Sequence, residues 1–123
     1  MKKQQAPFLS GRIKSITYAF KGLITLITTE HSIMVQLIVS AIMCVVGFYF
    51  KISSVEWMFQ ILAIGLVLTA ESLNTAIEAI CDFIQPNFDK KIGFIKDIAA
   101  GAVTFAALTA IIIGAFIYIP KIF

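Results

Sequence analysis

Long uncharged stretches dominate the hydrophobic pattern of this chain. Residues 32–50 form an uncharged run of nineteen positions, and residues 98–119 form one of twenty-two. Between them, the segment 55–84 is uncharged only over residues 57–70, and its second half carries acids. A helix needs about 20 apolar residues to cross the roughly 30 Å hydrocarbon layer of a bilayer. The pattern therefore predicts three membrane-spanning helices, at about 32–50, 55–84 and 97–119.

A different pattern precedes the first span. Between residues 12 and 28, apolar side chains recur at spacings of three and four, which is the period of one helix face. The basic residues Arg12, Lys14 and Lys21 lie off that face. A basic amphipathic helix of this kind is typical of the membrane interface. We therefore expect a surface helix at about 12–28, preceded by a tail over residues 1–11.

Composition separates this chain from soluble proteins. Hydrophobic residues make up 59% and charged residues 14% of the sequence, and the mean hydropathy is +0.94, against about 45–50% and about 25% in soluble domains. The net charge of +3 is modest, and basic residues do not interleave with aromatic ones, so no nucleic-acid partner is expected. Cys44 and Cys81 lie in apolar stretches, which indicates packing rather than a disulfide or metal site. The predicted fold is an all-α integral membrane protein with one membrane-embedded domain over residues 1–123.

Lysine and arginine residues predict the orientation of the chain in the membrane. Five of them precede the first span, and the segment 85–97 carries three. The turn at 51–55 and the C-terminus carry one lysine each. Because cytoplasmic segments are enriched in Lys and Arg, we expect the N-terminus and residues 85–97 in the cytoplasm and the C-terminus outside.

Four polar residues share one face of the second span. Glu71, Asn74, Glu78 and Asp82 follow one another at spacings of three and four. Charged groups at membrane depth are costly unless they are paired or hydrated, so they commonly mark functional sites. Two structural explanations are alternatives to a functional site. Either the helix leaves the bilayer at Glu71, or the face is a packing seam between helices. Exposure to water explains the acids but not their common face, so a functional stripe is favoured.

The depth of these acids suggests separate tasks. Glu71 is the first acid after the apolar half of its helix, at a depth that a lipid hydroxyl reaches, and Glu78 lies two turns further toward water. Mg²⁺ binds one or two carboxylates together with substrate phosphates. By depth, Glu71 is therefore the acid placed to meet a lipid, and Glu78 with Glu30 is the candidate pair of Mg²⁺ ligands.

Lys96 and Asp97 stand at the start of the last span. They fit an ordinary helix end, where a lysine side chain extends to the interface. They also fit a phosphate-binding cation held by its neighbouring acid. The sequence contains no Walker motif, kinase glycine-rich loop, Rossmann fingerprint or zinc-ligand spacing, so a nucleotide site has to be built differently.

One run of twelve residues carries a family resemblance. It reads Glu71-Ser-Leu-Asn-Thr-Ala-Ile-Glu-Ala-Ile-Cys-Asp82 and resembles the signature of the prokaryotic diacylglycerol kinase family. The match continues at residues 18–22, at Glu30 and at Lys96-Asp97, so it covers roughly residues 12–120.

The resemblance implies a fold and an activity. It implies a homotrimer of three-span subunits in the bacterial cytoplasmic membrane, each with an N-terminal surface helix, and active sites between protomers at the cytoplasmic interface. The implied reaction transfers the γ-phosphate of ATP, with Mg²⁺, to the hydroxyl of a membrane lipid. By position, Glu71 is the implied general base, and Glu30 and Glu78 are the implied metal ligands. The implied nucleotide contacts come from Tyr18, Glu30, Glu78, Lys96 and Asp97, and Asn74 and Asp82 are supporting polar residues.

Two further segments bear on the lipid. Residues 117–121 and 47–50 look more like the undecaprenol kinases of Gram-positive and related bacteria than the enterobacterial diacylglycerol kinases. The resemblance therefore favours undecaprenol slightly. Residues 86–89 depart from the family, because relatives often have a Tyr-His pair there.

Two functions of other classes remain open on sequence grounds. In a small transporter or channel subunit, the acids of the second span would form a cation path, but the uncharged run 98–119 of the last span carries no acid to continue it. A non-catalytic assembly protein would leave the shared face of the acids and Lys96-Asp97 unexplained. ATP hydrolysis stimulated by a lipid alcohol distinguishes the lipid kinase from both.

Overall fold

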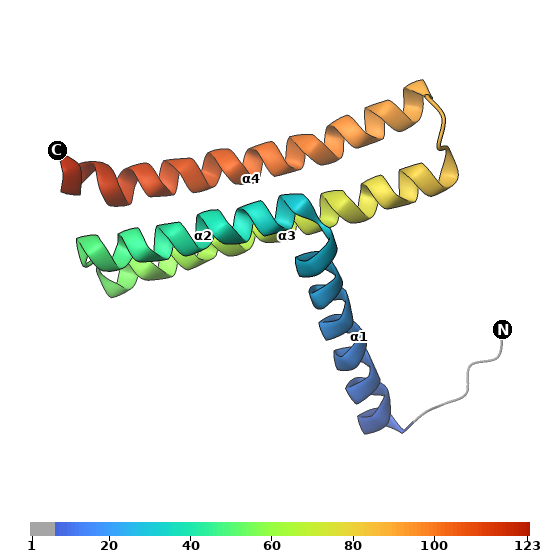
Figure 1. The fold of residues 1–123 in the computed structure, drawn as a ribbon, viewed down its shortest axis with the longest axis horizontal. Helices are drawn as coiled ribbons and strands as arrows, with labels where there is room; N and C mark the ends of the chain where they lie inside the picture. The colour runs from blue at the N-terminus through green and yellow to red at the C-terminus, as the bar shows by residue number, and fades with distance from the viewer. Residues whose placement is uncertain (1–6) are drawn as a thin grey trace.

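Four helices make up the part of the chain that the structure describes. The computed structural model describes residues 7–123, which form α1 (Phe8–Thr29), α2 (His31–Phe50), α3 (Ser54–Ile84) and α4 (Lys90–Ile122). The last three are long and apolar enough to cross a membrane, which confirms the all-α class and the three predicted spans. These three helices form the bundle, and α1 projects sideways from it (Figure 1). That course suits a helix in the membrane interface, which stays a prediction.

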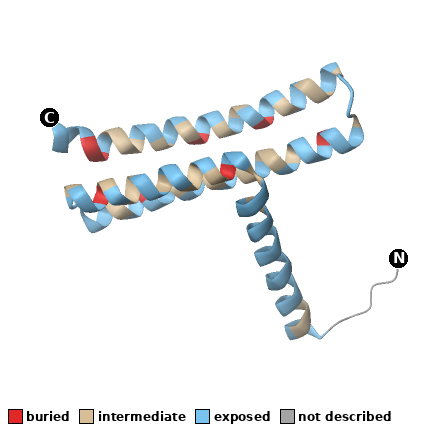
Figure 2. Ribbon diagram, in the orientation of Figure 1, coloured by how far each residue is buried: buried red, intermediate tan, exposed pale blue. Residues whose placement is uncertain are grey.

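Few side chains are buried between these helices. Figure 2 shows short buried patches along the helices and exposed surface over most of their length. Large apolar side chains such as Phe105 and Ile111 are 78% and 66% exposed. Exposing apolar surface to water costs about 25 cal/mol per Å², whereas in a bilayer the same side chains contact hydrocarbon. The apolar surplus of the sequence therefore fits a lipid environment.

The three spans differ in length. At about 1.5 Å per residue, the 20 residues of α2 match the hydrocarbon layer of roughly 30 Å. The 31 residues of α3 and the 33 residues of α4 reach about 46 and 50 Å. Both helices therefore continue past the beginning of α2 (Figure 1). We call this extension, with the loop 85–89, the polar end.

The opposite end of the bundle, which we call the turn end, contains the α2–α3 turn and the C-terminus. Lys51 is left-handed with φ 52°, and the N–H of Ile52 donates to the Gly47 carbonyl at 3.2 Å, which closes a Schellman motif. The Ser53 hydroxyl then accepts the Glu56 N–H, and the Glu56 carboxylate accepts the Ser53 N–H. This capping box starts α3 at Ser54, one residue earlier than expected.

A buried polar network joins the three spans near the turn end. The Gln60 amide donates to the Met43 carbonyl at 3.1 Å, and the Tyr118 hydroxyl donates to Gln60 Oε1 at 2.5 Å. Gln60 and Tyr118 are 5% and 8% exposed. Because Met43, Gln60 and Tyr118 belong to α2, α3 and α4, the network fixes the register of all three helices.

The first helix begins earlier than predicted. Residues 1–6 of the expected tail lie outside the described residues, and α1 begins at Phe8 rather than at residue 12. Pro7 has no N–H to satisfy, and its carbonyl accepts the Ser10 hydroxyl at 3.1 Å and the Gly11 N–H at 3.0 Å, so the helix starts there.

The last helix is longer than the predicted span 97–119 at both ends. The Asp89 carboxylate accepts the N–H groups of Lys91 and Ile92 at 2.9 and 3.2 Å, and this cap starts α4 at Lys90. Pro120, which the sequence predicts to end the span, lies inside the helix. A proline in the last turn removes only one backbone hydrogen bond, and the Phe123 N–H still donates to the Ile119 carbonyl.

Candidate active site

The polar stripe of Glu71, Asn74, Glu78 and Asp82 runs toward the polar end of α3. Glu71 lies 17 residues after Ser54, which is about 26 Å along the helix, still within the roughly 30 Å layer. Glu78 lies about 36 Å along the helix, past that layer. A hydrocarbon layer that begins at Ser54 would therefore end between Glu71 and Glu78, as the sequence predicts.

Two members of the stripe contact each other. Asn74 Nδ2 donates to Glu78 Oε1 at 3.2 Å, one turn further along α3. The Asn74 Oδ1 atom is buried and has no hydrogen-bond partner within residues 7–123. The contact holds one carboxylate oxygen of Glu78, which is otherwise exposed, and leaves the other oxygen free to bind a ligand.

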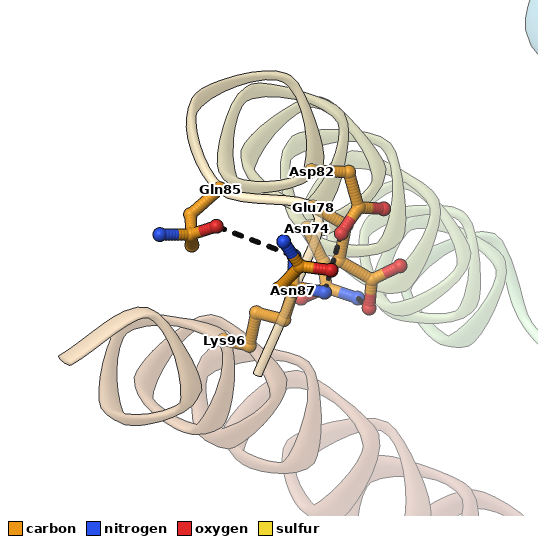
Figure 3. Close-up of polar contacts among 6 residues, drawn as sticks. All are labelled: Asn74, Glu78, Asp82, Gln85, Asn87 and Lys96. Atoms are coloured by element: carbon orange, nitrogen blue, oxygen red, sulfur yellow. Dashed lines mark hydrogen bonds and ion pairs between the residues drawn. The ribbon is translucent and has the colours of Figure 1, made fainter. Parts of the chain in front are cut away.

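A second contact joins the stripe to the last helix. Lys96 Nζ lies 2.6 Å from Asp82 Oδ1, and Figure 3 shows the lysine extending from α4 toward the α3 side chains. The two side chains are 37% and 62% exposed. The acid that holds Lys96 is therefore Asp82 and not its sequence neighbour Asp97, which corrects the sequence interpretation. Adjacent residues of a helix do not face each other.

The other candidate acids make no such contacts. Glu71 is half-buried, and within residues 7–123 its carboxylate has no ion pair or hydrogen bond. Glu30 is half-buried at the junction of α1 and α2, and its side chain does not cap α2. Asp97 is exposed and has no ion pair in the described part of the chain. All three carboxylates are therefore available to a ligand.

Tyr18 lies on α1 and is 68% exposed. It lines a groove of about 510 Å³ between α1 and α3, whose other walls are mainly small or apolar side chains: Ala19, Gly22, Leu23, Leu26, Ser72, Thr75, Ala76 and Ala79. At about 100° per residue, the α3 wall of this groove follows the face next to the polar stripe. Tyr18 thus borders a groove on the side of α3 adjacent to the stripe, and within residues 7–123 its side chain makes no hydrogen bond.

The candidate metal ligands are the two carboxylates of Glu30 and Glu78. Within residues 7–123, no three His, Cys, Asp or Glu side chains are grouped closely enough to hold a metal ion. Mg²⁺ does not need such a group, because it commonly takes one or two carboxylates and completes its shell with phosphates and water. The free oxygen of Glu78 and the uncapped carboxylate of Glu30 are hard oxygen donors, so the donor set fits Mg²⁺.

Several structural polar residues escaped the sequence analysis. The Lys121 ammonium lies 3.1 Å from Glu56 Oε1 at the turn end, and Gln60 bonds to Tyr118. The Ser53-x-x-Glu56 spacing is a recognisable capping signal, and Asp89 before a run of helix formers is another. Nothing in the sequence pairs Gln60 with Tyr118, because 58 residues separate them.

Comparison with known sequences identifies the family. The sequence profile described as prokaryotic diacylglycerol kinase matches residues 17–118. An undecaprenol kinase of Bacillus subtilis is 35% identical over 114 residues, which are 93% of each chain. A diacylglycerol kinase of Escherichia coli K12 is 28% identical over 81% of this chain and 82% of its own length. A diacylglycerol kinase of Synechocystis is 27% identical over 97% of this chain and 67% of its own length.

The family match includes Tyr18, Glu30, the whole polar stripe and Lys96-Asp97, because all of them lie within residues 17–118. It removes the transporter and assembly alternatives, and it implies phosphoryl transfer from ATP to a lipid. The chain belongs to the prokaryotic diacylglycerol kinase family, and it is a lipid kinase.

Proposed function

We propose that the chain transfers the γ-phosphate of ATP, with Mg²⁺, to the hydroxyl of a membrane lipid alcohol at the polar stripe. The observation that carries this proposal is the depth of the stripe. Glu71, which has no ion pair within residues 7–123, lies about 26 Å along α3 from Ser54, whereas Glu78 and Asp82 with their polar contacts lie about 36 and 42 Å along it. A lipid hydroxyl can reach Glu71 from the membrane side, and a water-soluble nucleotide can reach Glu78 and Asp82 from the aqueous side.

The proposed reaction uses Glu71 for the lipid hydroxyl and the residues nearer the polar end for the nucleotide. The lipid oxygen forms a bond to the γ-phosphorus, the bond between that phosphorus and the β–γ bridging oxygen breaks, and ADP leaves. The Glu71 carboxylate orients the lipid hydroxyl and accepts its proton. Tyr18, Lys96 and Asp97 contact the nucleotide, with Lys96 toward its phosphates.

Two carboxylates are proposed to hold the metal. Glu78 and Glu30 offer hard oxygen atoms, and the Asn74 amide fixes the orientation of the Glu78 carboxylate through its 3.2 Å hydrogen bond. Mg²⁺ bound there, with the phosphates, would neutralise charge on the transferred group. Glu30, Glu78 and the nucleotide therefore form one unit in this proposal, and loss of either acid weakens Mg²⁺ binding.

We infer that the working unit is a homotrimer with the polar end in the cytoplasm. Glu71 and Glu78 have no basic partner within residues 7–123, and neighbouring protomers offer partners for such acids. The sideways course of α1 (Figure 1) and the concentration of lysines before α2 and around residues 85–97 support the same orientation.

The lipid is proposed to be undecaprenol rather than diacylglycerol. The relative named undecaprenol kinase is 35% identical over 93% of the chain, whereas the Escherichia coli relative named diacylglycerol kinase is 28% identical over 81%. Both lipids present a primary alcohol, so the same stripe serves either one.

The deciding experiment measures phosphorylation by the purified chain in lipid vesicles. Mg-ATP is supplied with undecaprenol or diacylglycerol at matched surface concentration, and the phosphorylated lipid is quantified. We expect both to react and undecaprenol to give the higher kcat/KM. A higher value for diacylglycerol would reverse the lipid assignment, and no phosphorylation of either lipid would reject the kinase proposal.

The base assignment is tested with Glu71→Gln. We expect kcat to fall by roughly 100-fold or more, the usual scale for losing a general base, with little change in nucleotide affinity. Glu56→Gln is the matched control, because it removes an acid of the same helix at the turn end. Near-normal turnover of Glu71→Gln would exclude the base role, and lost nucleotide binding would move Glu71 to the nucleotide site.

A further inference from the structure

The ion pair of Asp82 and Lys96 joins α3 to α4 at the polar end. The Lys96 ammonium lies 2.6 Å from Asp82 Oδ1, across a hairpin of 14 residues (Figure 3). The lysine side chain is 37% exposed and the aspartate side chain is 62% exposed. The contact therefore directs the ammonium toward α3 and leaves it accessible to a solute.

The lysine keeps binding capacity in this position. A lysine ammonium has three N–H donors. Within residues 7–123, the Lys96 side chain makes one hydrogen bond, to Asp82. Two N–H donors of the Lys96 ammonium therefore remain for the oxygens of an anion. A lysine without a partner has a flexible four-carbon chain that samples many rotamers, so Asp82 narrows the positions that the ammonium occupies.

The register of α3 determines where the ammonium is held. Asp82 follows Glu78 by four residues, which is one turn or about 6 Å along the helix. The Asn74 amide fixes Glu78 in turn. The cation and the proposed metal-binding carboxylate are thus held on one face at a spacing that a polyphosphate chain spans.

We propose that Asp82 is a positioning residue that holds the Lys96 ammonium ready for the nucleotide phosphates. This inference rests on the proposed function, which assigns Lys96 to the nucleotide. Asp82 touches neither substrate in this arrangement. Its effect passes through Lys96 and alters nucleotide binding more than the chemical step.

The opposite role is that Asp82 competes with phosphate for Lys96. The exposure of the pair argues against competition, because an ion pair open to water is weak and this one uses a single carboxylate oxygen. An incoming phosphate can therefore share the ammonium with Asp82. The two roles predict opposite signs, since competition makes Asp82→Asn bind the nucleotide more tightly.

The experiment uses the full chain in lipid vesicles and two readouts. Binding of a non-hydrolysable Mg-ATP analogue is measured directly, and KM for ATP and kcat are measured with saturating lipid alcohol. We expect Lys96→Gln to weaken binding by about 10- to 100-fold, the scale of a lost charge-assisted hydrogen bond. Asp82→Asn should raise KM by about twofold to fivefold, since the ammonium remains but is no longer held in place, with kcat changed by less than about twofold. Asp82→Glu should recover most of the affinity.

A double variant separates positioning from other roles. If Asp82 acts through Lys96, adding Asp82→Asn to Lys96→Gln has no further effect on nucleotide binding. Glu56→Gln is the matched control, because it breaks the other α3–α4 ion pair, the 3.1 Å contact with Lys121 at the turn end. It should leave nucleotide affinity unchanged. Asp82→Ser is measured beside Asp82→Asn, so that poor folding of one variant does not decide the result.

Each contrary outcome has a defined meaning. Unchanged or tighter binding by the Asp82 variants, while Lys96→Gln binds weakly, overturns the positioning role and leaves the proposed function intact. Additive losses in the double variant, or an equal loss in Glu56→Gln, also overturn it. Unchanged binding by Lys96→Gln overturns the nucleotide assignment of Lys96 and this inference with it.

Discussion

Removing the Tyr118 hydroxyl tests the polar network that joins the three spans. That hydroxyl donates to Gln60 Oε1, and the Gln60 amide donates to the Met43 carbonyl at 3.1 Å. Both side chains are buried, with 8% and 5% of their surface exposed. Tyr118→Phe keeps the ring and leaves a buried carbonyl oxygen without its donor. No water replaces that donor within the hydrocarbon layer.

The expected loss of stability follows from this geometry. An unsatisfied buried acceptor costs about 1–3 kcal/mol in soluble proteins, and interhelical hydrogen bonds in membranes average about 0.6 kcal/mol with a maximum near 1.7. Because the Gln60 oxygen is nearly inaccessible, we expect Tyr118→Phe to lower the free energy of unfolding by about 1–1.7 kcal/mol. The assay is reversible unfolding in mixed micelles with increasing denaturing detergent, followed by circular dichroism.

Two further variants make this measurement decisive. Tyr49→Phe is the matched control, because Tyr49 is 78% exposed, and its stability should change by no more than about 0.5 kcal/mol. Adding Gln60→Leu to Tyr118→Phe removes both polar partners and should restore part of the lost stability. Equal stability of Tyr118→Phe and Tyr49→Phe would refute the reasoning. Lipid phosphorylation should survive in folded Tyr118→Phe, because the network lies far from the polar stripe.

Three other predictions concern the metal, the topology and the oligomer. Glu30→Gln and Glu78→Gln should each raise the Mg²⁺ concentration needed for half-maximal activity, because each removes a charged oxygen ligand; titration curves equal to the parent's would exclude both ligands. In a cysteine-free background, Ser54→Cys should react with a membrane-impermeant reagent added outside the cell, and Lys90→Cys should not. Reaction of both cysteines from the same side of the membrane would contradict the three-span topology. Mixed oligomers of Glu71→Gln and Glu30→Gln subunits should regain part of the activity if sites are shared between protomers, and verified mixed oligomers without activity would count against shared sites.

The sequence by itself determined the number of spans and the placement of the polar stripe. A bilayer core of roughly 30 Å requires about 20 apolar residues, so the uncharged runs fixed where α2, α3 and α4 cross. Helical geometry is the same in every context, so the spacing of Glu71, Asn74 and Glu78 was enough to put them on one face. The twelve-residue signature then indicated the family, which the comparisons confirm.

Tertiary structure decided the contacts between helices. The sequence offered Asp97 as the neighbour of Lys96, but the partner is Asp82 on α3, because side chains pair across helices according to the register in which those helices pack. The same register brings Tyr118 to Gln60 across 58 residues. Local periodicity specifies the face on which a residue lies, whereas the partner on the opposing helix depends on the crossing of two helices and on the turns that join them. Those turns are set by the left-handed Lys51 and the Asp89 cap, and the full lengths of α3 and α4 follow from them.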